Sequence, residues 1–96
     1  MLNSKDRAKL KSIASTTETI LQVGKGGIGE ALVKQVDDAL AARELVKLHA
    51  LETAPMAPGE LAALLAEATG AQVVQVIGRK LVLYRKNLKK PVLLQD

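Results

Sequence analysis

The sequence predicts an α/β fold: a single compact domain in the element order α-β-α-β-α-β-β, with a mixed four-stranded sheet packed with helices. Three segments place apolar residues at the i, i+3, i+4 spacing of amphipathic helices, and four short segments are rich in β-branched and aliphatic residues. Glycine and proline clusters separate several of these segments. The chain has 96 residues, 48% of them hydrophobic, which is enough for one core. We therefore expect one domain over residues 1–96.

The first predicted helix covers residues 4–14, with Ser4 as its N-cap. Its apolar face consists of three residues at helical spacing: Leu10, Ile13 and Ala14. The basic side chains of this helix lie off that face, toward solvent or a ligand. A polar linker follows, and the run from Thr19 to Val23 predicts the first strand.

The second predicted helix covers residues 30–42, and its charges agree with the helix dipole, because Glu30 lies at the N-terminus and Arg43 at the C-terminus. Its expected buried face is formed by four residues: Leu32, Val36, Ala39 and Leu40. Residues 45–51 predict the second strand. Alternate side chains of this strand face opposite sides of the sheet. One side carries Val46, Leu48 and Ala50, and the other carries Lys47 and His49.

The third predicted helix covers residues 59–69 and follows a break in the chain at Pro55 and Pro58. Its apolar stripe is expected to consist of four residues: Leu61, Leu64, Leu65 and Ala68. Gly70 would end this helix, because glycine readily adopts the left-handed conformation that is common at that position.

Residues 73–77 and 81–85 predict a closing β-hairpin, in which Tyr84 is expected to be half-buried. The basic and then apolar segment 87–96 is expected to be a loose tail or an edge strand. Two helical connections would make the first three strands parallel neighbours, and the hairpin would add the fourth strand antiparallel. The helices would then cover the sheet in a two-layer or three-layer sandwich.

Basic residues are concentrated near the two ends of the chain. Residues 1–12 carry a net charge of +3 and residues 79–90 carry +6, whereas residues 13–78 contain four bases and eight acids. Such an asymmetry indicates a surface that binds a polyanion. The candidate basic residues are Lys5, Arg7, Lys9, Lys11, Arg79, Lys80, Arg85 and Lys86.

Composition argues against several other functions. The chain has no cysteine, so disulfides, thiolate zinc sites and thiol catalysis are impossible. Its only histidine, His49, has no acid–base partner placed by the sequence, so we expect no catalytic residue, no metal site and no cofactor. No apolar run is long enough to span a membrane and no signal peptide is visible, so we expect a cytoplasmic protein without a membrane partner. The only aromatic residue, Tyr84, cannot supply the base-stacking surface of an RRM domain.

A glycine-rich loop at residues 24–29 connects the first strand to the second helix, where unpaired backbone N–H groups favour phosphate. Gly24, Gly26 and Gly29 match the G-x-G-x-x-G dinucleotide fingerprint, which would suit a small nucleotide-binding enzyme with Glu52 at the ribose. Gly24 to Gly27 also match the G-x-x-G loop that holds a nucleic-acid backbone in KH domains, with Lys25 adding a charge. A tight turn without a ligand is the third alternative. The short chain and its basic hairpin favour an RNA backbone.

Four longer motifs cover nearly the whole chain at specific spacings: Leu2-x-x-Lys5-x-Arg7-x-x-Leu10-Lys11, Val23-Gly24-Lys25-Gly26-Gly27-Ile28, Ala39-Leu40-x-x-Arg43-Glu44-Leu45-Val46-Lys47-Leu48 and Val76-Ile77-Gly78-x-x-Leu81-Val82-Leu83-Tyr84-Arg85. With these motifs the chain resembles the CRM domain family (chloroplast RNA splicing and ribosome maturation), specifically its stand-alone bacterial members of the YhbY type. One segment departs from the family pattern, because residues 15–19 lack the histidine, leucine and proline that usually precede the first strand.

The resemblance implies a fold similar to the C-terminal domain of bacterial translation initiation factor three. It also implies a non-enzymatic protein that contacts ribosomal RNA during assembly of the large ribosomal subunit. The implied contacts are the loop residues Gly24, Lys25, Gly26 and Gly27 and the first-helix bases Lys5, Arg7, Lys9 and Lys11. We therefore expect structured RNA, in the form of large-subunit ribosomal RNA or its precursor particle, as the partner of a monomeric protein.

Overall fold

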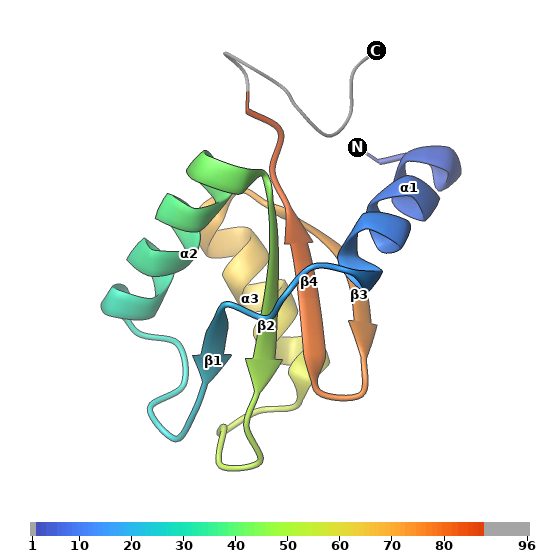
Figure 1. Cartoon of the computed structure of the whole chain (residues 1–96). Helices are drawn as coiled ribbons and strands as arrows, with labels where there is room; N and C mark the ends of the chain where they lie inside the picture. The colour runs from blue at the N-terminus through green and yellow to red at the C-terminus, as the bar shows by residue number, and fades with distance from the viewer. Residues whose placement is uncertain (1, 88–96) are drawn as a thin grey trace.

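The computed structural model describes residues 2–87, which fold into three helices and four strands in the predicted order (Figure 1). The helices are α1 (Ser4–Ser15), α2 (Glu30–Arg43) and α3 (Pro58–Thr69). The strands are β1 (Leu21–Val23), β2 (Leu45–Ala50), β3 (Gln72–Ile77) and β4 (Lys80–Tyr84). Apart from Asn87, the tail predicted at residues 87–96 lies outside the described residues.

The four strands form one mixed sheet in the order β1-β2-β4-β3. β1 pairs parallel to β2, whereas β4 pairs antiparallel to both β2 and β3. The prediction that the first three strands are parallel neighbours is therefore wrong for β3, because β4 lies between β2 and β3. Residues 81–84 of β4 are all buried, so this strand suits a position covered on both faces. β3 exposes Val76 and Ile77 and occupies the edge.

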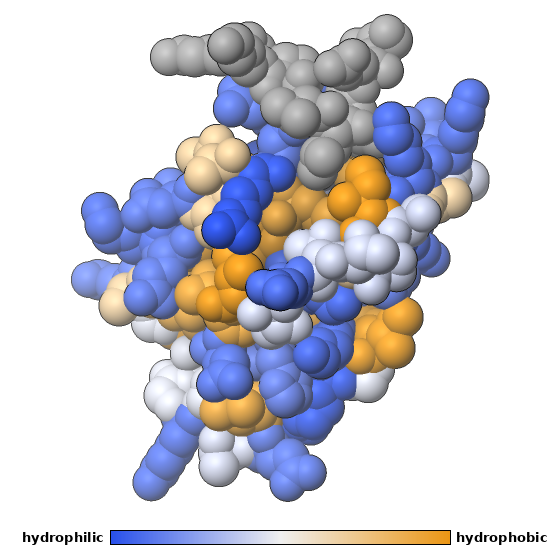
Figure 2. All heavy atoms as spheres, viewed as in Figure 1, coloured by the Kyte–Doolittle hydropathy of each residue, from blue (hydrophilic) through white to orange (hydrophobic). Residues whose placement is uncertain are grey.

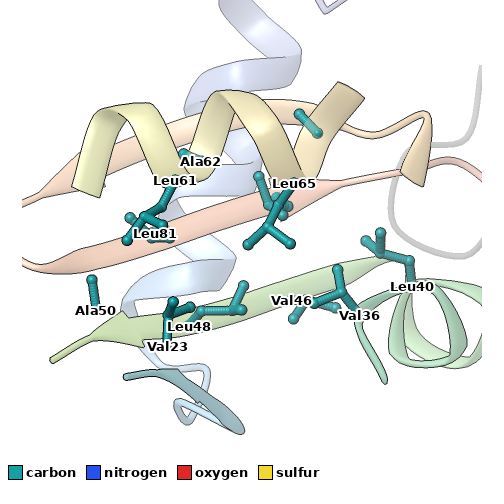
Figure 3. Packing of buried hydrophobic residues seen from close by; sticks show 12 residues of the cluster. Val23, Val36, Leu40, Val46, Leu48, Ala50, Leu61, Ala62, Leu65 and Leu81 are labelled. Atoms are coloured by element: carbon teal, nitrogen blue, oxygen red, sulfur yellow. The ribbon is translucent and has the colours of Figure 1, made fainter. Parts of the chain in front are cut away.

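The helices lie on both faces of the sheet, so the three-layer alternative is correct (Figure 1). α2 and α3 cover one face, where Leu40 of α2 and Leu65 of α3 pack with Leu48 of β2 in the larger cluster of buried residues (Figure 3). α1 covers part of the other face, where its Leu10 packs in a smaller cluster of buried residues together with Tyr84 of β4. Tyr84 is only 2% exposed rather than half-buried, because β4 is a central strand.

The N-cap of α1 lies one residue earlier in the sequence than predicted. Asn3, rather than Ser4, is the N-cap, and its side-chain oxygen accepts a hydrogen bond from the backbone N–H of Asp6 at 2.7 Å. Ser4 is the first helical residue. Asparagine and serine cap helices about equally well, so the sequence alone did not distinguish the two positions.

The buried face of α3 differs from the predicted stripe. The buried residues are Leu61, Ala62, Leu65, Ala66 and Thr69, whereas Leu64 is 42% exposed and Ala68 is also exposed. The small side chains of Ala62 and Ala66 let the helix backbone lie close to the sheet, and this contact turns Leu64 outward. The hydroxyl of Thr69 donates to the carbonyl of Leu65 at 2.7 Å, so the buried polar group is paired.

Glu44 connects the end of α2 to the chain that leaves β4. It is buried and has a positive φ of 67°, which is unusual for a residue other than glycine. Its carbonyl accepts a hydrogen bond from the backbone N–H of Arg85 at 2.9 Å, and its carboxylate accepts one from the backbone N–H of Asn87 at 2.7 Å. Within the Arg43-Glu44-Leu45 motif, Glu44 therefore serves the fold.

Candidate nucleic-acid interface

The glycine-rich loop lies at one end of the sheet, together with the β2–α3 connection and the β3–β4 turn (Figure 1). Backbone hydrogen bonds hold these segments together. The N–H of Leu51 donates to the carbonyl of Val23 at 2.8 Å, and the N–H of Ala50 donates to the carbonyl of Arg79 at 2.8 Å. We call this region, residues 24–29, 51–57 and 78–79, the loop end of the molecule.

The loop begins with a tight turn closed by a hydrogen bond from the N–H of Gly27 to the carbonyl of Gly24 at 2.9 Å. The turn presents Lys25 and Gly26 at its exposed tip. Gly27 has a φ of 65°, and a Cβ atom there would lie 2.9 Å from Cγ of Pro55. The fold therefore requires glycine at position 27.

The fold does not require the other glycines of the loop in this way. Gly24, Gly26 and Gly29 have no positive φ. A Cβ atom on Gly26 or Gly29 would meet no atom within 4 Å, and one on Gly24 would make an ordinary contact of 3.5 Å with Leu51. The alternative of a tight turn without a ligand therefore accounts for Gly27 only. The open space beside Gly26 leaves room for another backbone to approach closely.

The N-terminus of α2 opens onto this loop. Its N-cap, Gly29, supplies no side-chain hydrogen bond, and the first helical hydrogen bond runs from the N–H of Val33 to the carbonyl of Gly29 at 3.0 Å. The preceding N–H groups of the first turn have no intrahelical acceptor, which makes this end of the helix electropositive. The exposed carboxylate of Glu30 lies in the same turn and partly offsets that potential.

The basic residues of α1 divide into two groups. Lys5, Lys9 and Lys11 are exposed. The guanidinium of Arg7 instead donates hydrogen bonds to the carbonyls of Val73 and Val74 of β3, at 2.8 and 3.0 Å. Arg7 thus attaches α1 to the sheet at the position where the β3–β4 register shifts.

Two further arginines of the predicted site also bind within the fold. Arg79 donates to the carbonyls of Ala50 and Leu51, both at 2.6 Å, and so closes the end of β2. Arg85 forms an ion pair with Asp37 of α2 and donates to the carbonyl of Thr69 at the end of α3, at 2.7 Å. These contacts use the guanidinium groups inside the protein.

The predicted site residues consequently occupy three regions. Lys25, the loop glycines and Arg79 lie at the loop end, and Lys80 follows directly after it. The α1 lysines lie on a separate helix (Figure 1). Arg85 and the half-buried Lys86 lie beyond the other end of β4, beside the C-termini of α2 and α3.

The sequence interpretation missed Lys47, which lies on β2. Its ammonium donates to the carbonyl of Ala14 at 3.0 Å and so binds the C-terminal end of α1. A cation at that end of a helix is favourable because the helix dipole is negative there. The alternation of β2 already placed Lys47 on the side opposite Val46 and Leu48, but only the fold shows that α1 ends there.

The alternative of a dinucleotide site is not favoured by the sheet order. β1 lies at the edge of the sheet, whereas the fingerprint strand of a dinucleotide-binding fold has parallel neighbours on both sides. Within residues 2–87, no group of three or more histidine, aspartate or glutamate side chains could hold a metal ion. No helix in the same part of the chain is long and apolar enough to cross a membrane.

Comparison with known proteins gives matches along nearly the whole chain. The family model described as the CRS1 / YhbY (CRM) domain matches residues 2–85. The probable RNA-binding protein YqeI of Bacillus subtilis (strain 168) is 38% identical over 87 residues, which cover 91% of each chain. The probable RNA-binding protein MJ0652 of Methanocaldococcus jannaschii is 35% identical over 88% of this chain and 63% of its own.

A solved structure gives the same result for the fold. The solution structure of the hypothetical protein SAV1595 from Staphylococcus aureus, described as a candidate RNA-binding protein, has 46% sequence identity with this chain and a TM-score of 0.76. The match covers 90% of both chains.

Proposed function

The chain belongs to the CRS1 / YhbY (CRM) domain family, and from this premise we propose that it is a non-enzymatic RNA-binding protein. The names of two relatives, YqeI and MJ0652, describe probable RNA-binding proteins, and the solved structure with 46% identity is described in similar terms. The proposed ligand is therefore RNA rather than a free nucleotide.

The observation that carries the proposal is the glycine loop. Gly26 has open space around it, and Lys25 is exposed beside it. The packing of the fold therefore does not explain why these two residues stand at the tip of the loop. We propose that backbone N–H groups of this loop and of the first turn of α2 bind RNA phosphates. Lys25 would neutralise a neighbouring phosphate, and the exposed lysines of α1 would bind phosphates farther along the RNA.

The proposed biological partner is large-subunit ribosomal RNA or its precursor particle, which the family resemblance suggests. A protein that contacts backbone phosphates and ribose hydroxyls recognises the shape of a folded RNA more than its sequence. Such recognition suits an assembly factor that acts in the cytoplasm, where ribosomal particles mature, and that binds as a monomer.

Two loop variants test the proposal. Gly26→Ala should leave the stability unchanged, because its Cβ would meet no atom, but should weaken binding to a folded ribosomal RNA fragment by obstructing the backbone approach. Lys25→Ala should weaken binding by roughly threefold to tenfold through loss of one phosphate contact. Affinity would be measured by fluorescence anisotropy and stability by thermal unfolding.

The chain offers matched controls for both variants. Gly59→Ala replaces another glycine with open space around it, in the first turn of α3, and Lys34→Ala removes another exposed lysine, on α2. Neither control should change RNA affinity as much as its counterpart in the loop. If all four variants bind RNA equally well, the loop is not the site. A thermal shift with NAD or ATP, without any binding to RNA, would instead favour the nucleotide-binding alternative.

A further inference from the structure

α1 covers only part of its face of the sheet. Its buried residues, Leu10 and Ala14, pack only with one group of sheet residues: Leu45, Val74, Val82 and Tyr84. The sheet continues beyond this contact toward the loop end. Figure 2 shows the side of the molecule that carries α1, and its lower part, over the loop end of the strands, is mainly hydrophilic. A largely polar sheet surface, bordered on β3 by the exposed Ile77, therefore adjoins the proposed RNA site.

A single row of residues crosses this open surface. In the register of the sheet, Gln22 of β1 pairs with His49 of β2, and His49 pairs with Lys80 of β4. Their sequence neighbours Val23, Ala50 and Leu81 are buried against α2 and α3, so the row points to the α1 side. Gln22 and Lys80 are exposed and His49 is half-buried. Adjacent strands lie about 4.8 Å apart, so the row spans roughly 10 Å.

The side chains of this row can form hydrogen bonds with a ligand. The glutamine amide and the neutral imidazole each contain both a donor and an acceptor, and lysine supplies a cation. Neither Gln22 nor His49 has a side-chain hydrogen bond to another residue within the range 2–87. The ammonium of Lys80 donates to the hydroxyl of Thr19 at 3.1 Å, which leaves its other protons available.

The position and charge of the row favour a polyanion that continues from the glycine loop. Gln22 precedes the loop by one buried residue, Val23, and Lys80 follows the β3–β4 turn. Lys47, two residues before His49 on the same face, reaches the end of α1 at Ala14. The row contains no acid, so it connects the loop end to α1 with a surface that is neutral or positive.

We propose that Gln22, His49 and Lys80 form a second RNA contact, in which Gln22 and His49 bind ribose 2′-hydroxyls and Lys80 binds a phosphate. The 2′-hydroxyl is both a donor and an acceptor, as are the amide and the imidazole that face it. No phenylalanine, tyrosine or tryptophan offers a stacking surface here, because the chain's only residue of these types, Tyr84, is buried under α1. This proposal rests on the proposed function, and it adds a means of distinguishing RNA from DNA.

Paired RNA and DNA ligands test this contact. Binding of Gln22→Ala, His49→Ala and the double variant would be measured with an RNA hairpin and with the same hairpin built from 2′-deoxynucleotides. Each single variant should lose roughly threefold to tenfold in affinity for the RNA hairpin and none for the DNA hairpin. Gln35→Ala, at an exposed position on α2, is the control and should change neither. Gln22 is exposed, so its replacement leaves the fold intact, as thermal unfolding would verify.

The same experiment separates this contact from the loop. Lys25→Ala should weaken RNA and DNA binding alike, because a phosphate contact does not detect the 2′-hydroxyl. If Lys25→Ala weakens binding and the row variants do not, the second contact is overturned and the proposed loop function stands. If the row variants alone lose RNA affinity, the second contact stands and the loop assignment fails. Equal losses on both hairpins in the row variants would also overturn the 2′-hydroxyl contact.

Discussion

Arg7 illustrates, at the scale of a single residue, how a charged side chain can serve the fold rather than a ligand. Its guanidinium donates to two adjacent carbonyls of β3, which lie 66 and 67 residues away in the sequence. Lys5 and Lys9 on the same helix remain exposed. A count of positive charges cannot separate these two roles, because the difference depends on what the folded chain places beside each side chain.

Replacing Arg7 should therefore affect stability more than binding. Arg7→Ala leaves two partly buried carbonyls without their donor, so we expect the free energy of unfolding to fall by about 1.5–3 kcal/mol. Lys5→Ala should change stability by less than about 0.5 kcal/mol and should weaken RNA binding instead. Urea unfolding and RNA titration of both variants would measure the contrast. Unchanged stability in Arg7→Ala would show that these hydrogen bonds contribute nothing.

The glycine loop could be located from the sequence, but the structural roles of its individual glycines could not. The G-x-x-G spacing located the loop between β1 and α2, where the structure has it. The requirement for glycine at position 27 comes from Pro55, which approaches from the β2–α3 connection. Likewise, the contacts of Arg79 and Arg85 depend on carbonyl groups at the ends of distant elements. Local patterns contain no information about such neighbours.

At the scale of the elements, type and order were predictable because each helix and strand has its own periodicity. The position of β4 was not predicted, although the uninterrupted apolar run at residues 81–84 already suited a central strand. The predicted buried face of α3 is wrong because the helical pattern favours the large residue Leu64, whereas the small residues Ala62 and Ala66 are the ones buried. Close packing of a helix on a sheet favours small side chains at the contact, which a stripe of large residues does not reveal.

The N-terminus of α2 gives a prediction at this scale. Glu30 stabilises the helix through the dipole but repels phosphate at the same end. Glu30→Gln should therefore strengthen RNA binding by roughly twofold to fivefold while lowering stability by about 0.3–1 kcal/mol. The opposite signs distinguish this effect from a general change in folding. Asp38, an exposed acid later in α2, provides the control. A variant in which Asp38 is replaced in addition to Glu30 should bind RNA no more tightly than Glu30→Gln alone.

At the scale of the whole molecule, the distribution of charge predicts how binding depends on salt. Nine cations are predicted for the interface. The three arginines among them donate hydrogen bonds within the fold and Lys86 is half-buried, which leaves five exposed lysines for phosphates: Lys5, Lys9, Lys11, Lys25 and Lys80. If each of these lysines neutralises one phosphate, the log–log slope of affinity against salt should be roughly −3.5 to −4.5. All nine cations would give roughly −6 to −8.

Co-sedimentation with large-subunit precursor particles should accordingly be lost as the salt concentration rises. Absence of the protein from these particles at low salt would contradict the proposed partner.

The register shift in β3 has a consequence for how copies of this protein meet one another. β3 is an edge strand, and a regular edge can accept a strand from a second chain. Between Val73 and Gln75 the regular pairing is interrupted, and Arg7 already binds the carbonyls of Val73 and Val74. The opposite edge, β1, is only three residues long. Neither edge therefore offers a long regular stretch of unpaired backbone to a second copy, which disfavours fibre-like aggregation at high protein concentration.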